Sequence, residues 1–302
     1  MELKLPYGFR DNELVTIEDV ESGLKCNCIC PSCKKQLIAR KGNINDHHFA
    51  HLENSDCGQA IETIVHRLSK EIISKEKYFV TPQINYPGTS VSVIEETEVQ
   101  IDDISLESKL GSIIPDIIIK SKSKSLIVEI KVTHEVTREK ERKIMKLNLP
   151  AIEVNASKII MKLYSNKNYL LKDEEYKRML IDETAYKYWI NNPKYGLKLE
   201  RLKSKLKDYC DEKEIKYIKY PEDFDTLEDC MYYIEDCPLN KRIWRSGWNK
   251  GKSYAKYDGD CYRCKYNPDL MKKSTASINK MYCAGHQINF NDLLKEIIRE
   301  LG

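Results

Sequence analysis

The chain has 302 residues, of which 41% are hydrophobic and 32% are charged, and its formal net charge is +3. This length allows one large domain or two to three smaller ones. The nearly balanced charge excludes a polycation, so any affinity for nucleic acid must come from local patches. No segment approaches the ~18 apolar residues of a membrane-spanning helix. Because residues 1–15 also lack the apolar core of a signal peptide, we expect no membrane association and a cytosolic protein.

The eleven cysteines fall into two groups, with five in residues 26–57 and six in residues 210–283. Such clustering in a cytosolic chain favours metal binding over a disulfide framework. The sequence therefore predicts three segments. These are a strand lead-in with a Cys/His zinc module (1–57), a mixed α/β core (58–160), and a helical, basic region with a second cysteine cluster (161–302).

Hydrophobic periodicity predicts the elements of the first two segments. A strand is expected over residues 14–20, and a buried stripe at helical spacing predicts a helix over 58–76. The elements expected next are strands over 78–87 and 99–110, a hairpin over 113–132, a helix over 133–150 that Pro150 stops, and a strand over 150–157. The resulting order, helix, strands, hairpin, helix and strand, predicts a mixed α/β domain. Residues 290–302 are expected to form an amphipathic helix.

The hairpin carries charged residues inside two apolar runs, IPDIII and LIVEIKV. If Lys120 lies opposite Ser125, Asp116 faces Glu129 across the ladder, and Lys131 shares their face. The opposite face is then apolar and buried, formed by Ile117, Ile119, Val128, Ile130 and Val132. A slip of one residue would destroy this segregation, so the sequence specifies the register.

Two carboxylates this close repel each other, and a divalent cation such as Mg²⁺ or Mn²⁺ removes the conflict. A neighbouring lysine can orient or deprotonate a water molecule or stabilise developing negative charge. Metal-assisted hydrolysis of a phosphodiester needs these parts. The alternative interpretation is an ordinary pair of strands whose acids and lysines form solvated ion pairs.

Pro115-Asp116 followed by Glu129-Ile130-Lys131 resembles the PD-(D/E)xK, or restriction endonuclease-like, nuclease superfamily. That superfamily has an αβββαβ core, the element order predicted above. The resemblance implies Glu62, Asp116 and Glu129 as ligands of Mg²⁺ or Mn²⁺, and Lys131 as the group on the side of the attacking water. Glu62 is offset from the apolar stripe of its predicted helix, and His66 follows one turn later.

Residues 26–51 contain a C-x₂-C pair and an H-x₂-H pair separated by fourteen residues, a spacing typical of a tetrahedral zinc site. We predict Cys30, Cys33, His48 and His51 as the ligands. There are more candidates than places: Cys28 and Cys57 are the first substitutes, and Cys26 and His47 also lie nearby.

This module is similar to the competence protein CoiA family, because the helix that carries Glu62 and the strands that carry Asp116 and Glu129 follow it directly. The similarity covers roughly residues 24–160. It implies a small zinc-binding head fused to a restriction endonuclease-like domain. The implied role lies in bacterial DNA processing, for competence, recombination or phage defence, with protein partners in such a system.

The last segment holds a second cysteine constellation, formed by Cys237, Cys261, Cys264 and Cys283. It predicts either a structural zinc ion or a [4Fe–4S] cluster, and the sequence leaves both open. Residues 238–257 combine six Lys or Arg residues with two Trp and two Tyr and contain no acid. This composition suits a nucleic-acid strand, and the predicted contacts are Lys241, Arg242, Trp244, Arg245, Trp248 and Lys250. A solvated loop with packed aromatic residues is the alternative.

The leading hypothesis is thus a metal-dependent deoxyribonuclease that acts on single- or double-stranded DNA. A non-catalytic nucleic-acid-binding protein with a nuclease-like fold and structural zinc sites is the second hypothesis. A zinc scaffold that only recruits protein partners is the third, and it leaves the acidic face of the hairpin unexplained.

Overall fold

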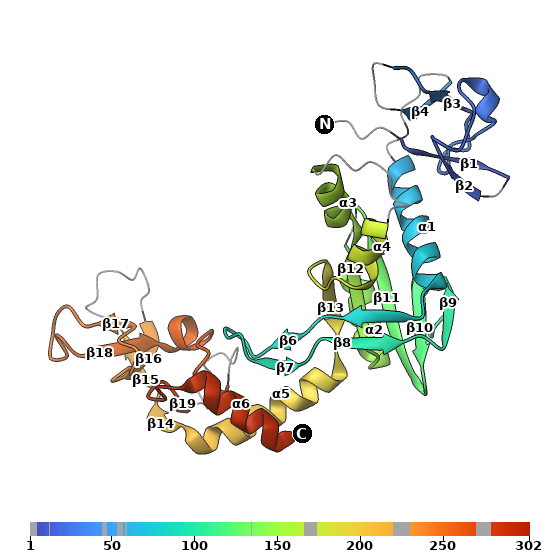
Figure 1. Ribbon diagram of the computed structural model, residues 1–302. Coiled ribbons are helices and arrows are strands. Elements are labelled where there is room, and N and C mark those ends of the chain that lie inside the picture. The colour runs from blue at the N-terminus through green and yellow to red at the C-terminus, as the bar shows by residue number, and fades with distance from the viewer. Residues whose placement is uncertain are drawn as a thin grey trace. The chain divides into compact units, whose positions relative to one another are not determined.

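The computed structural model describes residues 5–11, 13–43, 47–52, 57, 59–133, 135–165, 174–219, 230–269 and 279–302. The chain divides into two compact units, shown in Figure 1. Unit 1 comprises Met1–Pro82 and Glu96–Pro193, and unit 2 comprises Gln83–Glu95 and Lys194–Gly302. None of the described helices combines the length and the apolar character that crossing a bilayer requires.

Unit 1 begins with two short hairpins, one of β1 (Tyr7–Arg10) with β2 (Glu13–Thr16) and one of β3 (Leu37–Arg40) with β4 (His48–His51). Their inward-facing side chains are fully or almost fully buried, including Tyr7, Leu37 and Phe49. The chain packs closely here, because a Cβ atom on Gly8 would lie 2.9 Å from the Cβ of Cys28. A residue larger than glycine would push the cysteine segment away from β1.

The centre of unit 1 is a five-stranded sheet in the order β13-β12-β11-β10-β9. Its strands are β9 (Asp103–Leu106), β10 (Ile117–Ser121), β11 (Lys124–Lys131), β12 (Ala151–Asn155) and β13 (Lys187–Asn191). β11 and β12 are parallel and are joined through helix α2 (Arg138–Leu147), while the other neighbours are antiparallel. A crossover helix is the usual connection between parallel strands.

The predicted register of the central hairpin is confirmed, because Lys120 pairs with Ser125 and Ile117 with Val128. The ladder runs further than the apolar runs indicated and includes the pair Ser121 and Lys124. The turn is therefore reduced to two residues, of which Lys122 has a φ of 54°.

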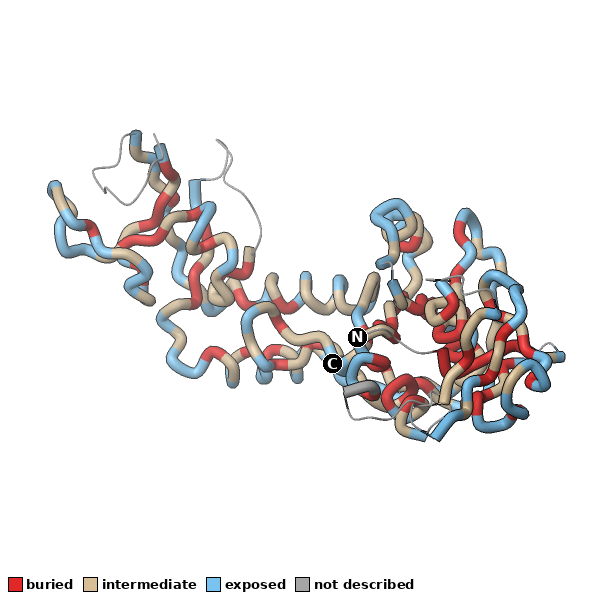
Figure 2. The backbone as a smooth tube through the Cα atoms, turned by 90° about the horizontal axis from the view of Figure 1, so that it is seen from above, coloured by how far each residue is buried: buried red, intermediate tan, exposed pale blue. Residues whose placement is uncertain are grey.

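Helices cover both faces of this sheet. α1 (Ala60–Lys75), α3 (Ala156–Ser165) and α4 (Glu174–Ile181) share one apolar core with the hairpin's apolar face. α2 covers the other face, where Ile144 packs with Ile127 and Ala151. In Figure 2 the buried segments of unit 1 run through the strands of the sheet and the helices against them. The predicted order of elements and the predicted buried face are both confirmed, whereas the assignment to a nuclease core stays a prediction.

A long hairpin connects the two units along the chain. β5 (Tyr78–Thr81) and β8 (Thr97–Gln100) pair in unit 1, and β6 (Ile84–Asn85) and β7 (Ser92–Ile94) pair in unit 2. In unit 2, the hairpin residue Tyr86 is buried with its ring 6.1 Å from that of Phe290. The boundaries of the two compact units differ from those of the three segments predicted from the sequence. The three segments stay a prediction.

Unit 2 contains more strand than the sequence predicted. Its helices are α5 (Pro193–Leu206) and α6 (Phe290–Leu301), the latter as expected. Besides β6 and β7, its described strands are β14 (Asp211–Glu214), β15 (Lys216–Lys219), β16 (Cys230–Glu235), β17 (Arg242–Ile243), β18 (Ser253–Lys256) and β19 (Lys280–Cys283). The prediction of a helical, basic region is wrong just beyond α5, because the extended segments β14 and β15 follow there.

Candidate functional site

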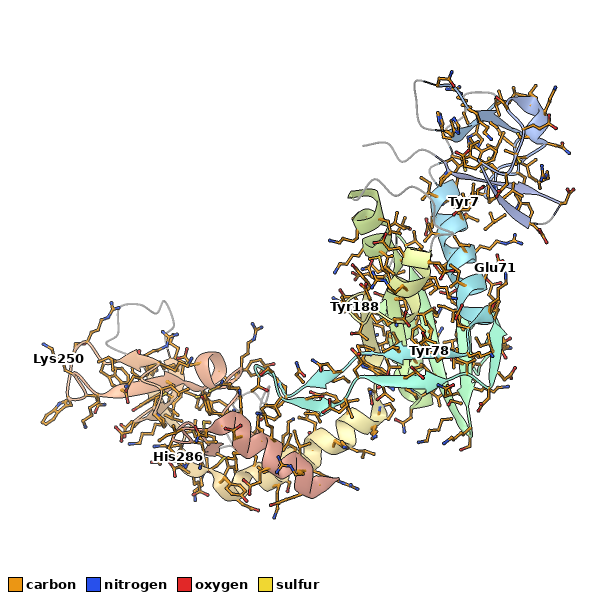
Figure 3. All side chains as sticks on the ribbon, viewed as in Figure 1. Tyr7, Glu71, Tyr78, Tyr188, Lys250 and His286 are labelled. Atoms are coloured by element: carbon orange, nitrogen blue, oxygen red, sulfur yellow. The ribbon has the colours of Figure 1, made fainter. Side chains whose placement is uncertain are left out.

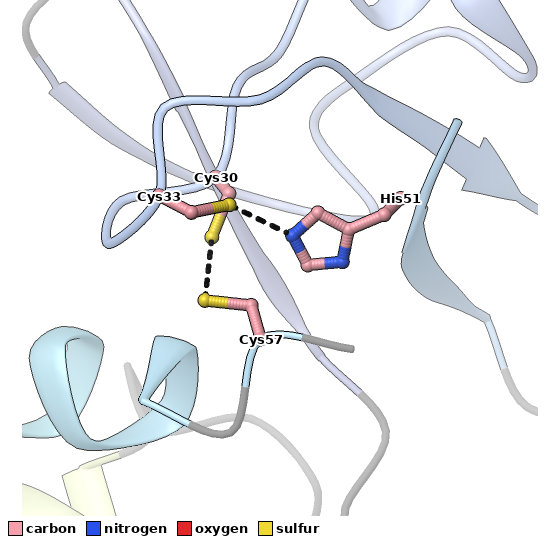
Figure 4. A group of neighbouring side chains, drawn as sticks. All are labelled: Cys30, Cys33, His51 and Cys57. Atoms are coloured by element: carbon pink, nitrogen blue, oxygen red, sulfur yellow. Dashed lines mark hydrogen bonds between the residues drawn. The ribbon is translucent and has the colours of Figure 1, made fainter. Parts of the chain in front are cut away.

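A group of three cysteines and one histidine is gathered in the N-terminal part of unit 1. It consists of Cys30, Cys33, His51 and Cys57, whose ligand atoms all lie within 4.8 Å of one another. Figure 4 marks two hydrogen-bonding contacts within the group. The Sγ of Cys33 lies 3.3 Å from Nε2 of His51, and the Sγ of Cys30 lies 3.9 Å from that of Cys57. Three thiols and one imidazole form a Cys₃His donor set, which is a common set for structural zinc.

The thiols of this group are electrostatically coupled. Burial raises the pKa of Cys30 to about 11. Burial acts on Cys57 in the same direction, but hydrogen bonds with Ser32, Cys30 and Cys33 hold the pKa of Cys57 below its ordinary value. Cys30 therefore holds its proton more tightly than Cys57 does. A zinc ion would replace such protons, because the thiolate is the form that binds metal.

The set differs from the predicted ligands at one position, because Cys57 takes the place of His48. The HFAH segment is a strand, and in a strand residues three apart point to opposite faces. His48 therefore lies on the other face of β4 from His51. Among the other candidates, Nδ1 of His47 lies 2.8 Å from Oε1 of Glu18.

Cys26 and Cys28 are core thiols of the N-terminal hairpins and not ligands of this group. Both are fully buried. The Sγ of Cys26 donates to the carbonyl of Leu37 at 3.4 Å, and the Sγ of Cys28 donates to the carbonyl of Cys26 at 3.1 Å. Burial raises the pKa of Cys28 to about 12, so its proton stays in place.

A separate group of carboxylates lies on the central sheet, at the end of the hairpin far from its turn. Asp116 immediately precedes β10, and Glu129 lies on β11 with only 3% of its surface exposed. Oδ2 of Asp116 accepts a hydrogen bond from the backbone N–H of Ile130 at 2.8 Å and lies 3.0 Å from Nε2 of His66. Burial alone would raise the pKa of Asp116, but these two partners hold it below its ordinary value.

The pKa of Glu129 is shifted in the opposite direction. Burial raises its pKa to about 7, the ammonium of Lys140 opposes the rise, and the carboxylate of Asp116 adds to it. Lys140 lies 2.7 Å from Oε2 of Glu129. Oε1 of the same residue is buried and has no hydrogen-bond partner among the described residues. An unsatisfied buried carboxylate oxygen beside a second carboxylate suits a cation such as Mg²⁺.

The remaining predicted catalytic residues lie near this pair but bind other partners. Oε1 of Glu62 accepts a hydrogen bond from the hydroxyl of Thr133. The ammonium of Lys131 pairs with Glu135 at 2.5 Å and lies 4.0 Å from Oε1 of Glu153. Among the described residues, Glu62, Asp116 and Glu129 do not form a group whose ligand atoms are all within 4.8 Å.

Two further residues of this region, Glu153 and Lys140, were not predicted from the sequence. Glu153 pairs with Glu129 across β11 and β12, so a third acid lies on the same face. Lys140 comes from the first turn of α2. Neither residue belongs to the short hairpin motif. The parallel pairing of β11 with β12 was the only signal that could have placed Glu153 there.

An open groove of about 800 Å³ runs along α1 and has His66 in its wall. Its lining mixes both charges, with Arg67 and Lys70 facing the groove beside Glu62 and Glu107. The ammonium of Lys70 pairs with the carboxylate of Glu107. The groove therefore passes His66, the partner of Asp116, and its wall carries both positive and negative side chains.

Only some of the predicted nucleic-acid contacts in unit 2 are exposed. The prediction for Trp244 is wrong, because only 5% of its surface is exposed and its ring stacks on Tyr254 with centroids 4.1 Å apart. The guanidinium of Arg242 makes hydrogen bonds of 2.6 and 3.3 Å with Asp260. The exposed members are Lys241, Arg245, Trp248 and Lys250. Trp248 is fully exposed on the loop where Figure 3 labels Lys250.

These observations define the class of the protein as a mixed α/β protein with a Cys/His group suited to metal and a separate carboxylate cluster. Residues 15–60 match the family model of the competence protein CoiA, N-terminal domain. The match contains all four members of the Cys/His group and ends at the first residue of α1, so it does not reach Asp116 or Glu129. No curated protein and no solved structure matches the chain.

Proposed function

We propose that the protein is a divalent-metal-dependent nuclease that hydrolyses phosphodiester bonds of DNA in a bacterial DNA-processing pathway. The observation that carries the proposal is the partnerless buried Oε1 of Glu129 next to the ionised Asp116. The similarity of residues 15–60 to the CoiA N-terminal domain supports a competence-related role. In this proposal the Cys30, Cys33, His51 and Cys57 group binds structural zinc.

Each residue of the carboxylate region has a role in the proposal. Asp116 and Glu129 would hold Mg²⁺ or Mn²⁺, and Glu62, which now accepts a hydrogen bond from Thr133, would be the third ligand. A bound divalent cation polarises the phosphoryl oxygen and lowers the pKa of a coordinated water. Lys131, whose pKa the neighbouring Glu135 raises, stays charged and stabilises negative charge that develops on the phosphate.

A second function is favoured by a specific observation. Lys140 already compensates the charge of Glu129, and Glu62 is engaged by Thr133. A site whose acids are neutralised by the protein itself does not need an ion. The alternative is therefore a non-catalytic nucleic-acid-binding protein that keeps the sheet and the zinc site.

Cleavage of plasmid and oligonucleotide DNA in Mg²⁺, Mn²⁺ or EDTA tests the proposal. We expect metal-dependent cleavage, and we expect Glu129→Ala to lose at least about a hundredfold in rate, because several kcal/mol of charge stabilisation depend on the ion. The matched control is Asp103→Asn, which alters an acid on the same sheet whose partner is Lys120 in an exposed ion pair. It should cleave like the unaltered protein.

Two outcomes would reject the nuclease. Cleavage that persists in EDTA would show that the acids hold no essential ion. Absence of nicking in both metals, together with undiminished DNA binding by Glu129→Ala, would establish the alternative function.

A further inference from the structure

The four cysteines of unit 2 come from separate segments and line one small cavity. Cys237 follows β16, Cys261 ends the π-helical turn Tyr257–Cys261, Cys264 comes three residues later, and Cys283 ends β19. The rest of the wall is mixed, because Lys241, Asp260 and Asn267 line it beside apolar residues. The apolar lining residues are Ile234, Leu239, Ala255 and Met281. A cavity surrounded by four sulfurs is an unusual feature for an ordinary core.

The four thiols lie close enough to influence one another's charge. Burial raises the pKa of Cys261, and Cys264, Cys237 and Cys283 raise it further. Burial likewise raises the pKa of Cys264 and of Cys283, and Cys237 acts on both. None of the four forms a disulfide. Four reduced thiols from separate segments of unit 2 therefore line the same cavity.

Hydrogen bonding distinguishes these sulfurs from the core thiols of the same chain. The Sγ of Cys210 donates to the carbonyl of Leu206 at 3.2 Å, as a buried thiol does when it keeps its proton. The Sγ of Cys283 instead accepts a hydrogen bond from the backbone N–H of Gly285 at 3.4 Å. Acceptance of N–H bonds is the role of a metal-bound thiolate.

The spacing of the sulfurs argues against a single zinc ion in the cavity. In a tetrahedral zinc site with Zn–S bonds of about 2.3 Å, neighbouring sulfurs are about 3.8 Å apart. The Cys30 group satisfies such a spacing, with all its ligand atoms within 4.8 Å. No three of the unit 2 cysteines, all of them described residues, meet the same limit. A [4Fe–4S] cluster takes one thiolate on each iron and holds the four sulfurs further apart than one zinc ion does.

We propose that Cys237, Cys261, Cys264 and Cys283 bind a [4Fe–4S] cluster in the cavity of unit 2. The site is separate from the carboxylates of unit 1, so the inference goes beyond the proposed nuclease function and does not depend on it. Lys241 also lines the cavity, and its ammonium offsets the negative charge of a cluster held by four thiolates. This assigns Lys241 an electrostatic task apart from contact with nucleic acid.

The test is the metal content of the full chain purified without oxygen. Iron, acid-labile sulfide and zinc are measured per chain, together with the visible absorption and the electron paramagnetic resonance spectrum after reduction by dithionite. We expect about four iron and about four sulfide per chain, in addition to the zinc of the Cys30 group. Two zinc ions per chain without iron, or no metal in unit 2 after reconstitution with iron and sulfide, would overturn the proposal.

Paired variants locate the cluster. Cys264→Ser, which changes a half-buried thiol, should lose most of the iron and the visible absorption while it keeps the zinc. Cys210→Ser should keep both, because the Sγ of Cys210 donates to a backbone carbonyl. Equal iron in the two variants would contradict the assignment. Because the readouts are iron and absorption, their failure is distinct from a failure to cleave DNA.

Discussion

The Cys/His group and the carboxylate pair both belong to unit 1, but the chain holds them in different ways. The first takes its ligands from a turn, from the end of β4 and from Cys57, which lies three residues before α1. No ladder therefore connects Cys57 to Cys30. In the second, Glu129 lies in the ladder of β11 with β12, and Asp116 lies just before β10, where its Oδ2 accepts a hydrogen bond from the backbone N–H of Ile130. We infer that the first group needs its ion to keep its segments together, whereas the sheet holds the second group with or without one.

The largest expected effect is on folding of the N-terminal hairpins. Structural zinc contributes roughly 10–16 kcal/mol of apparent binding free energy in zinc-finger peptides. Cys33→Ala should therefore abolish zinc binding and expose the amides of β3 and β4 to hydrogen exchange, while β11 keeps its protection. Cys230→Ala is the matched control, because both thiols are exposed and only Cys33 belongs to the group. Unchanged protection of β4 in the zinc-free variant would contradict this reasoning.

The next effect is a pH dependence of stability that the carboxylate pair should show without divalent metal. The pKa of Glu129 is about 7 in the folded chain against an ordinary 4.5, so the folded state binds the proton more tightly. The free energy of unfolding should then fall as pH rises from about 4.5 to about 7, by at most about 3 kcal/mol. The measurement is denaturant unfolding in EDTA at several pH values.

The control for this pH dependence is Glu129→Gln, whose curve should be flatter over the same interval. Other groups titrate there too, so the difference between the two proteins is the informative quantity. Addition of Mg²⁺ should reduce the loss in the unaltered chain, because a cation compensates the ionised pair. Parallel curves for the two proteins would show that Glu129 is not the source of the pH dependence.

A smaller effect is expected at Glu153, which acts on the site through Lys131. Oε1 of Glu153 lies 4.0 Å from the Lys131 ammonium, and Oε2 accepts from the backbone N–H of Val136 at 3.1 Å. Glu153→Gln keeps the shape and the acceptor, so we expect about a tenfold loss of cleavage rate, equivalent to ~1.4 kcal/mol. The loss should come with a change in the pH–rate profile. A loss of rate at all pH values together with a lower melting temperature would indicate a purely structural role.

Whether the sequence predicted a residue of these two groups depended on how far along the chain its interaction partners lie. The alternation of Ile117, Ile119, Val128 and Ile130 specified the hairpin register, because one slip would expose the whole apolar set. Glu153 and Lys140 could not be placed from that pattern, since their positions depend on the pairing of β12 and on the packing of α2. Trp244 was misplaced for a related reason, because composition does not reveal that a ring stacks on Tyr254.

The smallest expected effect concerns the one zinc ligand that the sequence misplaced. The C-x₂-C and H-x₂-H pairs predicted His48, but HFAH is extended, so His48 and His51 point to opposite faces of β4. His48→Ala should keep zinc at one equivalent per chain, whereas His51→Ala should lower zinc retention during dialysis against a chelator. Because both variants remove an imidazole from the same four-residue strand, a difference between them reports on ligation and not on strand stability. Equal loss of zinc in the two variants would indicate that His48 is a zinc ligand and would contradict the assignment of Cys57 in its place.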